Sequence, residues 1–234
     1  MYALYFKRPL DFLLSLMAII VLSPVLLILT VLGAVIMEGN PFFVQPRPGK
    51  KDHNGQEKIF HLIKFRSMNN RRDKNGNLLP DEQRLTKYGK FIRETSIDEL
   101  PELFNILKGD MSIVGPRPQL VRDMVFMTPE QRNRHNVRQG LTGLAQCNGR
   151  NGISWEKKFE YDLQYIENIT FWGDVKILMK TVKSVFVREG INEENMATAE
   201  DLGDYLLRIG VISQLEYKSK HEEAMFCLSE VSAC

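Results

Sequence analysis

The sequence contains few of the residues from which disulfide scaffolds and zinc sites are built. Its 234 residues include three cysteines and four histidines, and none of them has the spacing of a metal-ligand set. We therefore expect reduced thiols and structural or surface histidines. Neither a P-loop nor a G-x-G-x-x-G motif after a strand is present, which excludes two common nucleotide-binding signatures. A hydrophobic content of 44% excludes full-length disorder.

Charge is absent from one long apolar segment. No charged residue lies between Phe12 and Met37, a stretch of 26 residues, whereas about 20 apolar residues suffice to cross a bilayer. The segment predicts a membrane helix and is too long for the apolar region of a cleaved signal peptide. Ser23-Pro24 lies near its middle, where proline is expected to kink the helix. Basic residues flank both ends, so a spanning helix and a re-entrant helix stay equally open on these grounds.

Positive charge is concentrated in the middle of the chain. Residues 41–150 carry 20 basic and 12 acidic side chains, a net charge of +8, whereas residues 151–234 carry 9 and 15, a net charge of −6. The middle segment is therefore the expected anion-binding part. It contains no basic run with interleaved aromatic residues, so nucleic acid is not expected as a partner.

The residue pattern predicts a mostly helical α/β fold with a small β-hairpin. Residues 42–45 and 58–68 are expected to be strands that pair across a polar turn, and 69–84 a polar loop. Two helical pieces are expected between residues 86 and 109, the second starting near Ser96–Asp98. Residues 154–188 and 199–209 are also expected to be helical. The first of these carries an apolar stripe that we expect to pack against the domain rather than on a membrane surface. The stripe consists of Val175, Leu178, Met179, Val182, Val185 and Phe186.

Two adjacent carboxylates, Asp98 and Glu99, form the strongest local candidate for chemistry. They stand at a predicted helix start, where negative charge is favoured, so helix capping by Asp98 is one interpretation. The other interpretation is a nucleophilic carboxylate that attacks phosphorus, next to a ligand for Mg²⁺. For such a pair in isolation, capping is the commoner role.

Cationic side chains that could hold phosphate groups occur on both sides of this pair in the sequence. Arginine binds phosphate oxygens bidentately. Arg117 stands between two prolines that fix its backbone, and a glycine-rich loop contributes one further arginine. The predicted phosphate-binding residues are Lys64, Arg66, Arg93, Arg117 and Arg150.

Several unusual motifs occur in a fixed order along the chain. They are KRPLDF ahead of the apolar segment, QPRPGK, KFRSM, SIDELPELFNILKGDMSIVGPRP, VRQGLTGLAQCNGRN and SWEKKFEYDLQYIENIT. Together they resemble the bacterial sugar transferases known as monotopic phosphoglycosyl transferases. The small one-domain members of the di-N-acetylbacillosamine type are the most similar. The resemblance covers about residues 1–198.

The resemblance implies an activity. Members of the family transfer a sugar 1-phosphate from a UDP-sugar to a polyprenyl phosphate, such as undecaprenyl phosphate, in two steps that require Mg²⁺ and release UMP. By this resemblance Asp98 would form the covalent intermediate and, with Glu99, hold Mg²⁺, while Lys64, Arg66 and Arg117 would hold phosphates. The expected substrate is an N-acetylated UDP-sugar, and the expected role is the first membrane step of bacterial glycoconjugate assembly.

The resemblance also implies how the chain meets the membrane. The family has a re-entrant helix broken at a Ser-Pro pair, here Ser23 and Pro24, and amphipathic helices at the interface. The catalytic domain would face the cytosol at the bacterial inner membrane, where its substrates meet. Lys7 and Arg8 precede the apolar segment and are expected at anionic lipid headgroups.

Three parts of the chain are expected, and two other functions stay open. The parts are a membrane helix over residues 1–38, a catalytic domain over 39–198 and a C-terminal extension over 199–234. The extension either packs on the domain or contacts a second copy or a pathway partner. The other functions are a membrane-bound hydrolase of nucleotide-sugars or polyprenyl pyrophosphates, and a non-enzymatic scaffold that holds lipid phosphates. The motifs favour the transferase over both.

Overall fold

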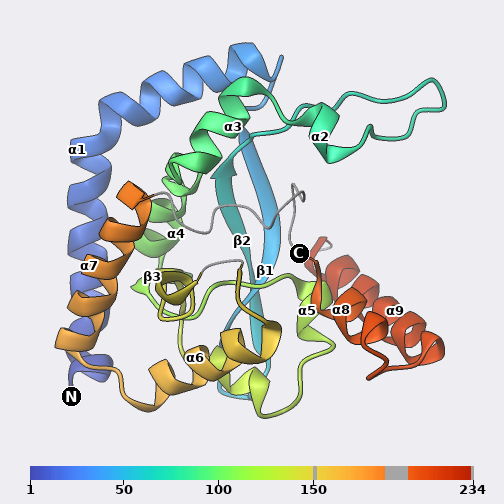
Figure 1. The fold of residues 1–234 in the computed structure, drawn as a ribbon. Coiled ribbons are helices and arrows are strands. Elements are labelled where there is room, and N and C mark those ends of the chain that lie inside the picture. Colours follow the sequence, from blue (N-terminus) through green and yellow to red (C-terminus); the bar gives the residue numbers. More distant parts are fainter. Residues whose placement is uncertain (150–151, 188–199, 233–234) are drawn as a thin grey trace.

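The computed structural model describes residues 1–149, 152–187 and 200–232 of the chain, and helices dominate it (Figure 1). The helices are α1 Lys7–Ile36, α2 Asp81–Arg84, α3 Lys87–Glu94, α4 Glu102–Lys108, α5 Val121–Met124, α6 Trp155–Glu167, α7 Phe171–Val187, α8 Leu202–Arg208 and α9 Gln214–Ser232. The strands are β1 Phe42–Lys51, β2 Glu57–Phe65, β3 Met111–Val114 and β4 Gln139–Thr142. The mostly helical α/β class that the sequence predicts is confirmed.

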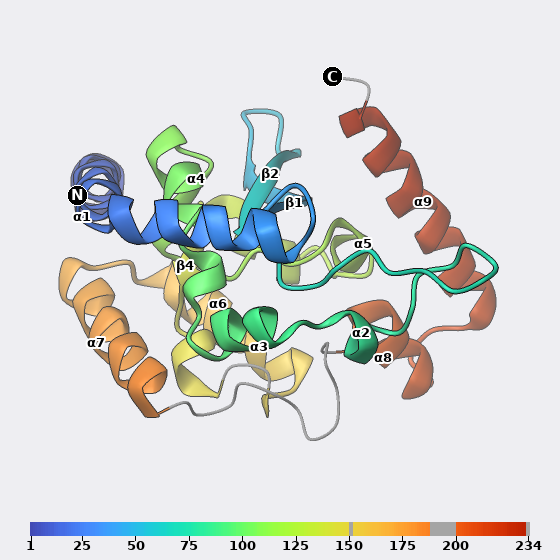
Figure 2. The same cartoon turned by 90° about the horizontal axis from the view of Figure 1, so that it is seen from above.

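The uncharged segment forms one long helix, α1, preceded by a π-helical turn over Tyr2–Phe6. The helix continues through Pro24, and the Ser23 hydroxyl donates a hydrogen bond to the Ile20 carbonyl at 2.8 Å. Figures 1 and 2 show that the two ends of α1 run in different directions. The long apolar helix is confirmed, whereas no break at Ser23-Pro24 is evident, and its re-entrant course stays a prediction.

A two-stranded antiparallel hairpin runs through the middle of the molecule (Figure 1). β1 pairs with β2 so that Phe42 lies opposite Phe65, which confirms the predicted hairpin. The sequence predicts that the first strand ends at Gln45 and that a turn follows, but β1 continues to Lys51. Among the described residues β1 pairs only with β2, so it is an edge strand, and an edge strand tolerates Pro46 and Pro48.

A second pair of strands, which the sequence does not predict, joins distant segments. β3 and β4 pair in parallel with Met111 opposite Gln139. Each strand has four residues, and the two are separated by the 24 residues 115–138. Parallel pairing needs such a long crossover, so no local signal announces it. The predicted helix over 154–188 is likewise two helices, because the chain leaves the helical conformation at Asn168 and α7 restarts at Phe171.

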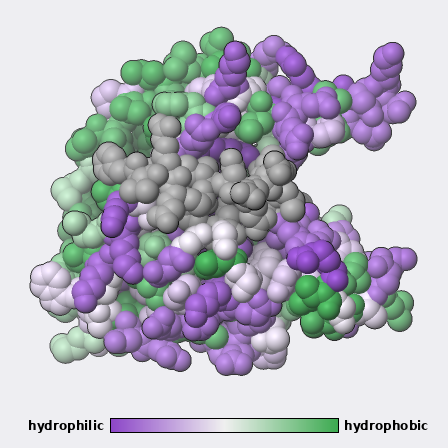
Figure 3. Space-filling model, in the orientation of Figure 1, coloured by the Kyte–Doolittle hydropathy of each residue, from purple (hydrophilic) through white to green (hydrophobic). Residues whose placement is uncertain are grey.

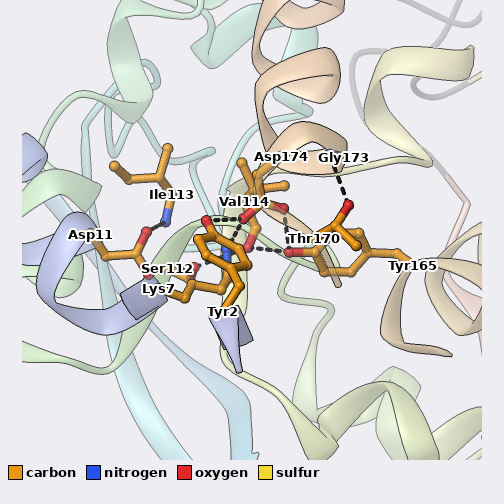
Figure 4. Close-up of polar contacts among 10 residues, drawn as sticks. All are labelled: Tyr2, Lys7, Asp11, Ser112, Ile113, Val114, Tyr165, Thr170, Gly173 and Asp174. Atoms are coloured by element: carbon orange, nitrogen blue, oxygen red, sulfur yellow. Dashed lines mark hydrogen bonds and ion pairs between the residues drawn. The ribbon is translucent and has the colours of Figure 1, made fainter. Parts of the chain in front are cut away.

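Buried carboxylates hold the start of α1 on the domain (Figure 4). Asp11 is 5% exposed and accepts a hydrogen bond from the Ser112 hydroxyl in β3 at 2.7 Å. Asp174 in α7 accepts hydrogen bonds from the hydroxyls of Tyr2 and Tyr165 at 2.8 and 2.9 Å. Because a buried carboxylate that loses its donors is costly, these contacts fix the direction in which α1 leaves the domain.

Lys7 and Arg8, expected at lipid headgroups, have partners within the protein, and a headgroup contact stays a prediction. The Lys7 ammonium pairs with Asp174 at 2.6 Å, and its side chain is 12% exposed. Arg8 donates to the carbonyl oxygens of Ile106 and Leu107, at the end of α4, at 2.6 and 2.8 Å. Cations stabilise a helix C-terminus, so Arg8 stabilises the end of α4 and ties α1 to it.

The C-terminal extension packs on the preceding domain, as one of the two sequence interpretations has it. Leu202 of α8 and Ala224 of α9 are 2% and 1% exposed, and both belong to a core cluster with Phe126, Trp155 and Phe159. α9 is a further helix that the sequence analysis does not predict. The predicted boundary at residues 198–199 lies outside the described residues. Contact with a second copy or a pathway partner stays a prediction.

The apolar stripe of α7 is divided between the core and the surface. Leu178 packs against the cluster of Val114, Tyr165 and Ile177, as predicted for the whole stripe. Met179 and Val182 are exposed, at 69% and 53%. The side chains of residues 185 and 186 lie outside the described part of the chain. The expected packing is therefore confirmed for Leu178 and not for its two exposed neighbours.

A buried histidine gives the fold a testable dependence on pH. His135 is fully buried, its Nδ1 lies 3.2 Å from a Glu57 carboxylate oxygen, and burial lowers the pKa of His135 from 6.5 to about 4. Below pH 6.5 the unfolded state therefore binds a proton that the folded state does not, so stability falls as the pH falls. We expect the free energy of unfolding to be lower by about 2 kcal/mol at pH 5 than at pH 7.5 from this group alone.

Chemical unfolding in detergent across this pH range measures the effect. His135→Asn keeps a side-chain N–H donor for Glu57 and removes the titrating ring, so its stability should change less between pH 7.5 and 5 than that of the unsubstituted protein. Equal slopes in the two proteins would show that His135 does not carry the dependence.

Candidate active site

The two adjacent carboxylates lie in a strained connection between two helices. Thr86 caps the start of α3, and its hydroxyl accepts the Gly89 N–H at 2.9 Å. After α3 ends, Ser96 adopts the left-handed conformation at φ 56°, and a 3-10 turn covers Ile97–Glu99. Such a conformation costs a non-glycine residue about 1 kcal/mol or more and is common at functional sites. It turns the chain so that Asp98 and Glu99 line a cavity.

Helix capping does not account for Asp98. The cap position of α4 is occupied by Pro101, and neither this helix nor the 3-10 turn has a side-chain capping bond. Of the two interpretations of the sequence, the capping interpretation is therefore wrong for Asp98. Within the described chain, its carboxylate has no hydrogen bond or ion pair.

Glu99 is the centre of an ion-pair network. One of its carboxylate oxygens, Oε1, accepts from the Lys64 ammonium at 2.8 Å and from the Arg117 guanidinium at 2.9 Å. Lys64 also pairs with Glu102 at 3.1 Å, and Glu102 is 2% exposed. Burial opposes ionisation of Glu99, but the charges of Arg117 and Lys64 outweigh it and hold the pKa of Glu99 well below its usual range. Glu99 is therefore a fixed anion.

The environment of Asp98 has the opposite effect on its proton. Burial and the charge of Glu99 raise the pKa of Asp98 to about 6, against the smaller effects of Lys64, Arg93 and Arg117. A carboxylate without hydrogen-bond donors, in a site rich in cations, is a stronger nucleophile than a solvated one. Perturbed carboxyl groups of this kind are typical of catalytic sites.

The cavity around these residues has a volume of about 940 Å³, within the usual range for a ligand site. It brings together four of the five predicted phosphate-binding residues: Lys64, Arg66, Arg93 and Arg117 all line it. Arg93 is oriented by a hydrogen bond from its Nε to the Ser67 hydroxyl at 2.8 Å. Arg150, the fifth, lies outside the described residues, so its role stays a prediction.

Sequence reasoning missed Arg47, which also lines the cavity. It donates to the Pro118 carbonyl at 3.0 Å and to the Gln45 side chain at 2.7 Å, with no carboxylate partner among the described residues. Burial and the charge of Arg117 lower the pKa of Arg47 to about 10, so a bound anion would stabilise its charge. The signal was present, because Arg47 and Arg117 each stand between two prolines.

Glu102 is a second residue that the sequence analysis did not single out. Burial and the charge of Glu99 raise its pKa to about 7, against the opposing effect of Lys64. It contributes to the site through Lys64, whose ammonium it shares with Glu99. Its position three residues after Glu99, on the first turn of α4, places it on the same side of the chain.

The carboxylates match the coordination preference of Mg²⁺ better than that of zinc. No cluster of three or more His, Cys, Asp or Glu side chains that could hold a metal occurs in the described part of the chain. Mg²⁺ is usually held by one or two carboxylates and completes its shell with water and substrate phosphates. Asp98 and the second carboxylate oxygen of Glu99 offer such a set, because Glu99 uses Oε1 for both of its cationic partners.

Comparison with known proteins identifies the family. The family model described as "Bacterial sugar transferase" matches residues 2–188. The sugar transferase EpsL of Bacillus subtilis (strain 168) is 52% identical over 179 residues, which cover 76% of this chain and 86% of EpsL. The "UDP-glucose:undecaprenyl-phosphate glucose-1-phosphate transferase" of Klebsiella pneumoniae is 39% identical over 194 residues, 79% of this chain and 41% of that protein.

A third relative carries the name of a different sugar. The "UDP-N-acetylgalactosamine-undecaprenyl-phosphate N-acetylgalactosaminephosphotransferase" of Aeromonas hydrophila is 36% identical over 194 residues, 80% of this chain and 45% of that protein. The chain thus spans less than half the length of the Klebsiella and Aeromonas relatives and most of the length of EpsL. Since the family model covers residues from the first helix through α7, the chain belongs to the bacterial sugar transferase family.

Proposed function

We propose that this protein transfers a sugar 1-phosphate from a UDP-sugar to undecaprenyl phosphate and releases UMP. The observation that carries the proposal is the Asp98 carboxylate, which has no partner within the described chain and lies in a cavity lined by at least four cationic side chains. The names of the relatives from Klebsiella and Aeromonas state this reaction class for those proteins. Their names differ in the sugar at similar identity, so identity does not assign the sugar here.

The reaction we propose has two steps at one carboxylate. An Asp98 oxygen attacks the β-phosphorus of the UDP-sugar, a bond between Asp98 and phosphorus forms, and the bond from β-phosphorus to the bridging oxygen breaks. UMP leaves with that electron pair, and the sugar phosphate stays on Asp98 as an acyl phosphate. A phosphate oxygen of the lipid then attacks the same phosphorus, and the carboxylate of Asp98 is the leaving group. No net proton transfer is needed in either step.

The protein's contribution to this chemistry is positioning and charge neutralisation. Lys64 and Arg117 carry positive charge next to the nucleophile and are held by Glu99. Arg66, Arg93 and the additional Arg47 extend the cationic lining toward the rest of the cavity. Fixed donors of this kind stabilise the charge that develops on transferring phosphoryl groups. Asp98 and Glu99 would hold Mg²⁺, which when bound neutralises phosphate charge.

We also propose that α1 is re-entrant and lies in one leaflet. α1 and the turn before it are long and apolar enough to cross a membrane. Only 11% of the most apolar 18-residue stretch of this segment is buried inside the protein. Yet both ends of the helix contact the same domain, through Asp11 at the start and through Leu29, whose carbonyl accepts from the Tyr88 hydroxyl at 3.1 Å, near the end. A helix that crossed the bilayer would carry one end away from a domain on one side.

Exposed apolar side chains mark the surface that would enter the membrane. Figure 3 shows them gathered along the edge formed by α1. On α7, Phe171 and Trp172 are exposed, and Phe171 contacts the Tyr2 ring at 5.8 Å between centroids, so the start of α7 adjoins the start of α1. Aromatic side chains are favoured at the membrane interface. We place the domain on the cytosolic face of the bacterial inner membrane, where UDP-sugars are available.

We further propose a class of donor sugar and a pathway. The motifs resemble those of di-N-acetylbacillosamine-type enzymes, which favours an N-acetylated UDP-sugar and a role in bacterial glycoconjugate assembly. The name of the Aeromonas relative contains an N-acetylated sugar, and that of the Klebsiella relative does not.

The release of UMP from a panel of UDP-sugars tests the proposal. We expect release from one or a few sugars, dependent on both undecaprenyl phosphate and Mg²⁺, and lost after chelation with EDTA. Without the lipid, release should stop after about one UMP per enzyme, because the acyl phosphate has no acceptor. Continued release without lipid would indicate a hydrolase instead. Tight binding of polyprenyl phosphate without any turnover would indicate a scaffold.

A further inference from the structure

The segment that carries Arg117 is held by charged side chains from other parts of the chain. Arg134, which is fully buried, donates to the carbonyl oxygen of Arg117 at 2.6 Å. Arg47 donates to the carbonyl oxygen of Pro118 at 3.0 Å. Since charge-assisted hydrogen bonds are stronger than neutral ones, these contacts fix the backbone from which the Arg117 side chain extends.

Asp123 joins the same segment to the C-terminal extension. Its side chain lies in α5 and the residue is 2% exposed. One carboxylate oxygen accepts the backbone N–H of Leu120 at 3.0 Å, and the other accepts the backbone N–H of Leu202 at 2.9 Å. A single buried carboxylate therefore connects the residues that follow Arg117 with the first residue of α8.

Other contacts place the extension at the wall of the cavity. Glu200 and Asp201 line the cavity. Asp201 pairs with Arg122, and the Trp155 indole N–H donates to the Glu200 carbonyl oxygen at 3.3 Å. Farther along the chain, the Lys220 ammonium of α9 donates to the carbonyl oxygen of Val125, the residue that follows α5, at 2.7 Å. The match to the family model ends at residue 188, so these contacts come from a part of the chain beyond it.

We propose that the C-terminal extension positions Arg117 for the phosphates of the UDP-sugar, and that it does so through the hydrogen bond between Leu202 and Asp123. The inference rests on the proposed function, in which Arg117 contacts the donor substrate. Leu202 and Asp123 are then positioning residues. Loss of the Leu202 N–H donor leaves a buried oxygen of Asp123 without a partner. The backbone around Leu120 then relaxes, and this shifts the nearby backbone from which the Arg117 side chain extends.

A proline at position 202 removes this hydrogen bond with little other change in backbone. Proline has no N–H and is tolerated at the first position of a helix, which Leu202 occupies. The preceding Asp201 has φ −71° and ψ 157°, a conformation that a following proline permits. Leu202→Ala is the matched control, because it removes the buried side chain and keeps the N–H.

We expect Leu202→Pro to raise the KM for the UDP-sugar about fivefold to tenfold above that of Leu202→Ala, at similar melting temperature. The effect on kcat should be smaller. The Kd for UDP, measured by calorimetry, should rise in the same proportion. This second readout tests the inference independently of turnover, whereas absence of UMP release from the unsubstituted protein would contradict the proposed function alone.

A double-mutant cycle separates positioning from a general loss of structure. In an Arg117→Ala background the two Leu202 variants should bind UDP equally, because the side chain through which the hydrogen bond acts is gone. If Leu202→Pro fails to fold, Asp123→Asn, which offers one acceptor oxygen to two N–H donors, replaces it in the same cycle. Equal KM and Kd for Leu202→Pro and Leu202→Ala, or equal losses in both Arg117 backgrounds, would overturn the inference.

Discussion

Asp98→Asn should abolish UMP release, with a loss of at least about 10³-fold in kcat. An amide has the shape of the carboxylate but is a poor nucleophile toward phosphorus, so the acyl phosphate cannot form. Asp98→Glu should retain little activity, because one added methylene displaces the nucleophile by about 1 Å, and such a displacement costs on the order of 10²-fold. Steady-state UMP release under saturating UDP-sugar and lipid measures both losses.

The structure makes this result specific to chemistry rather than folding. The Asp98 carboxylate has no hydrogen bond or ion pair in the described chain, so its substitution removes no polar contact. Because burial and the charge of Glu99 disfavour the ionised form of Asp98, the melting temperature of Asp98→Asn should be equal to or higher than that of the unsubstituted protein. Glu94→Gln, in α3, is the matched control, since it removes the same charge outside the cavity. Mass spectrometry after incubation with UDP-sugar alone should find the sugar phosphate on the peptide that contains Asp98. Near-normal turnover of Asp98→Asn would falsify the proposed nucleophile.

Arg117→Ala should lower kcat/KM by about 10²- to 10³-fold, the usual effect of losing one fixed donor to a developing phosphate charge. Arg117 is held between two prolines and pairs with Glu99 at 2.9 Å, so its guanidinium is fixed before substrate binds. Its loss leaves Glu99 with Lys64 as its remaining cationic partner among the described residues. Arg117→Lys should be intermediate, because an ammonium keeps the charge and loses the bidentate geometry.

Arg72→Ala provides the control for this pair of variants. Arg72 lies in the 69–84 loop, is exposed, and is not among the residues that line the cavity. The substitution Arg72→Ala therefore removes the same charge from the surface, away from the site. Its kcat/KM should stay within twofold of the unsubstituted protein's. Equal losses for Arg72→Ala and Arg117→Ala would mean that net charge, rather than the position of Arg117, governs the reaction.

Features that depend on neighbours in the sequence could be predicted. The hairpin follows from two β-rich runs around a polar turn, and the end of α4 follows from Gly109, whose φ of 100° suits glycine. The pairing of β3 with β4 could not be predicted, because each strand is short and its partner lies 24 residues away along the chain. The division into α6 and α7 was missed because residues 154–188 have a helical pattern without proline or a glycine pair to interrupt it.

The candidate site shows the same division. Asp98, Lys64 and Arg117 could be found from their motifs. Arg47 and Glu102 were recognised only when the fold placed them against Arg117 and Lys64. Nothing in the local sequence reveals Asp174 as the partner of Lys7, because the two residues lie far apart along the chain.

By itself the sequence determined that a long uncharged helix precedes a basic domain, and that an acidic pair stands among residues suited to phosphates. These properties depend on composition and short-range spacing. Only the tertiary structure decided that Asp98 lacks a polar partner among the described residues while Glu99 has two, and that the C-terminal extension forms part of the cavity wall. The physical reason is that ionisation and burial depend on distances between segments far apart in the chain, and folding alone sets those distances.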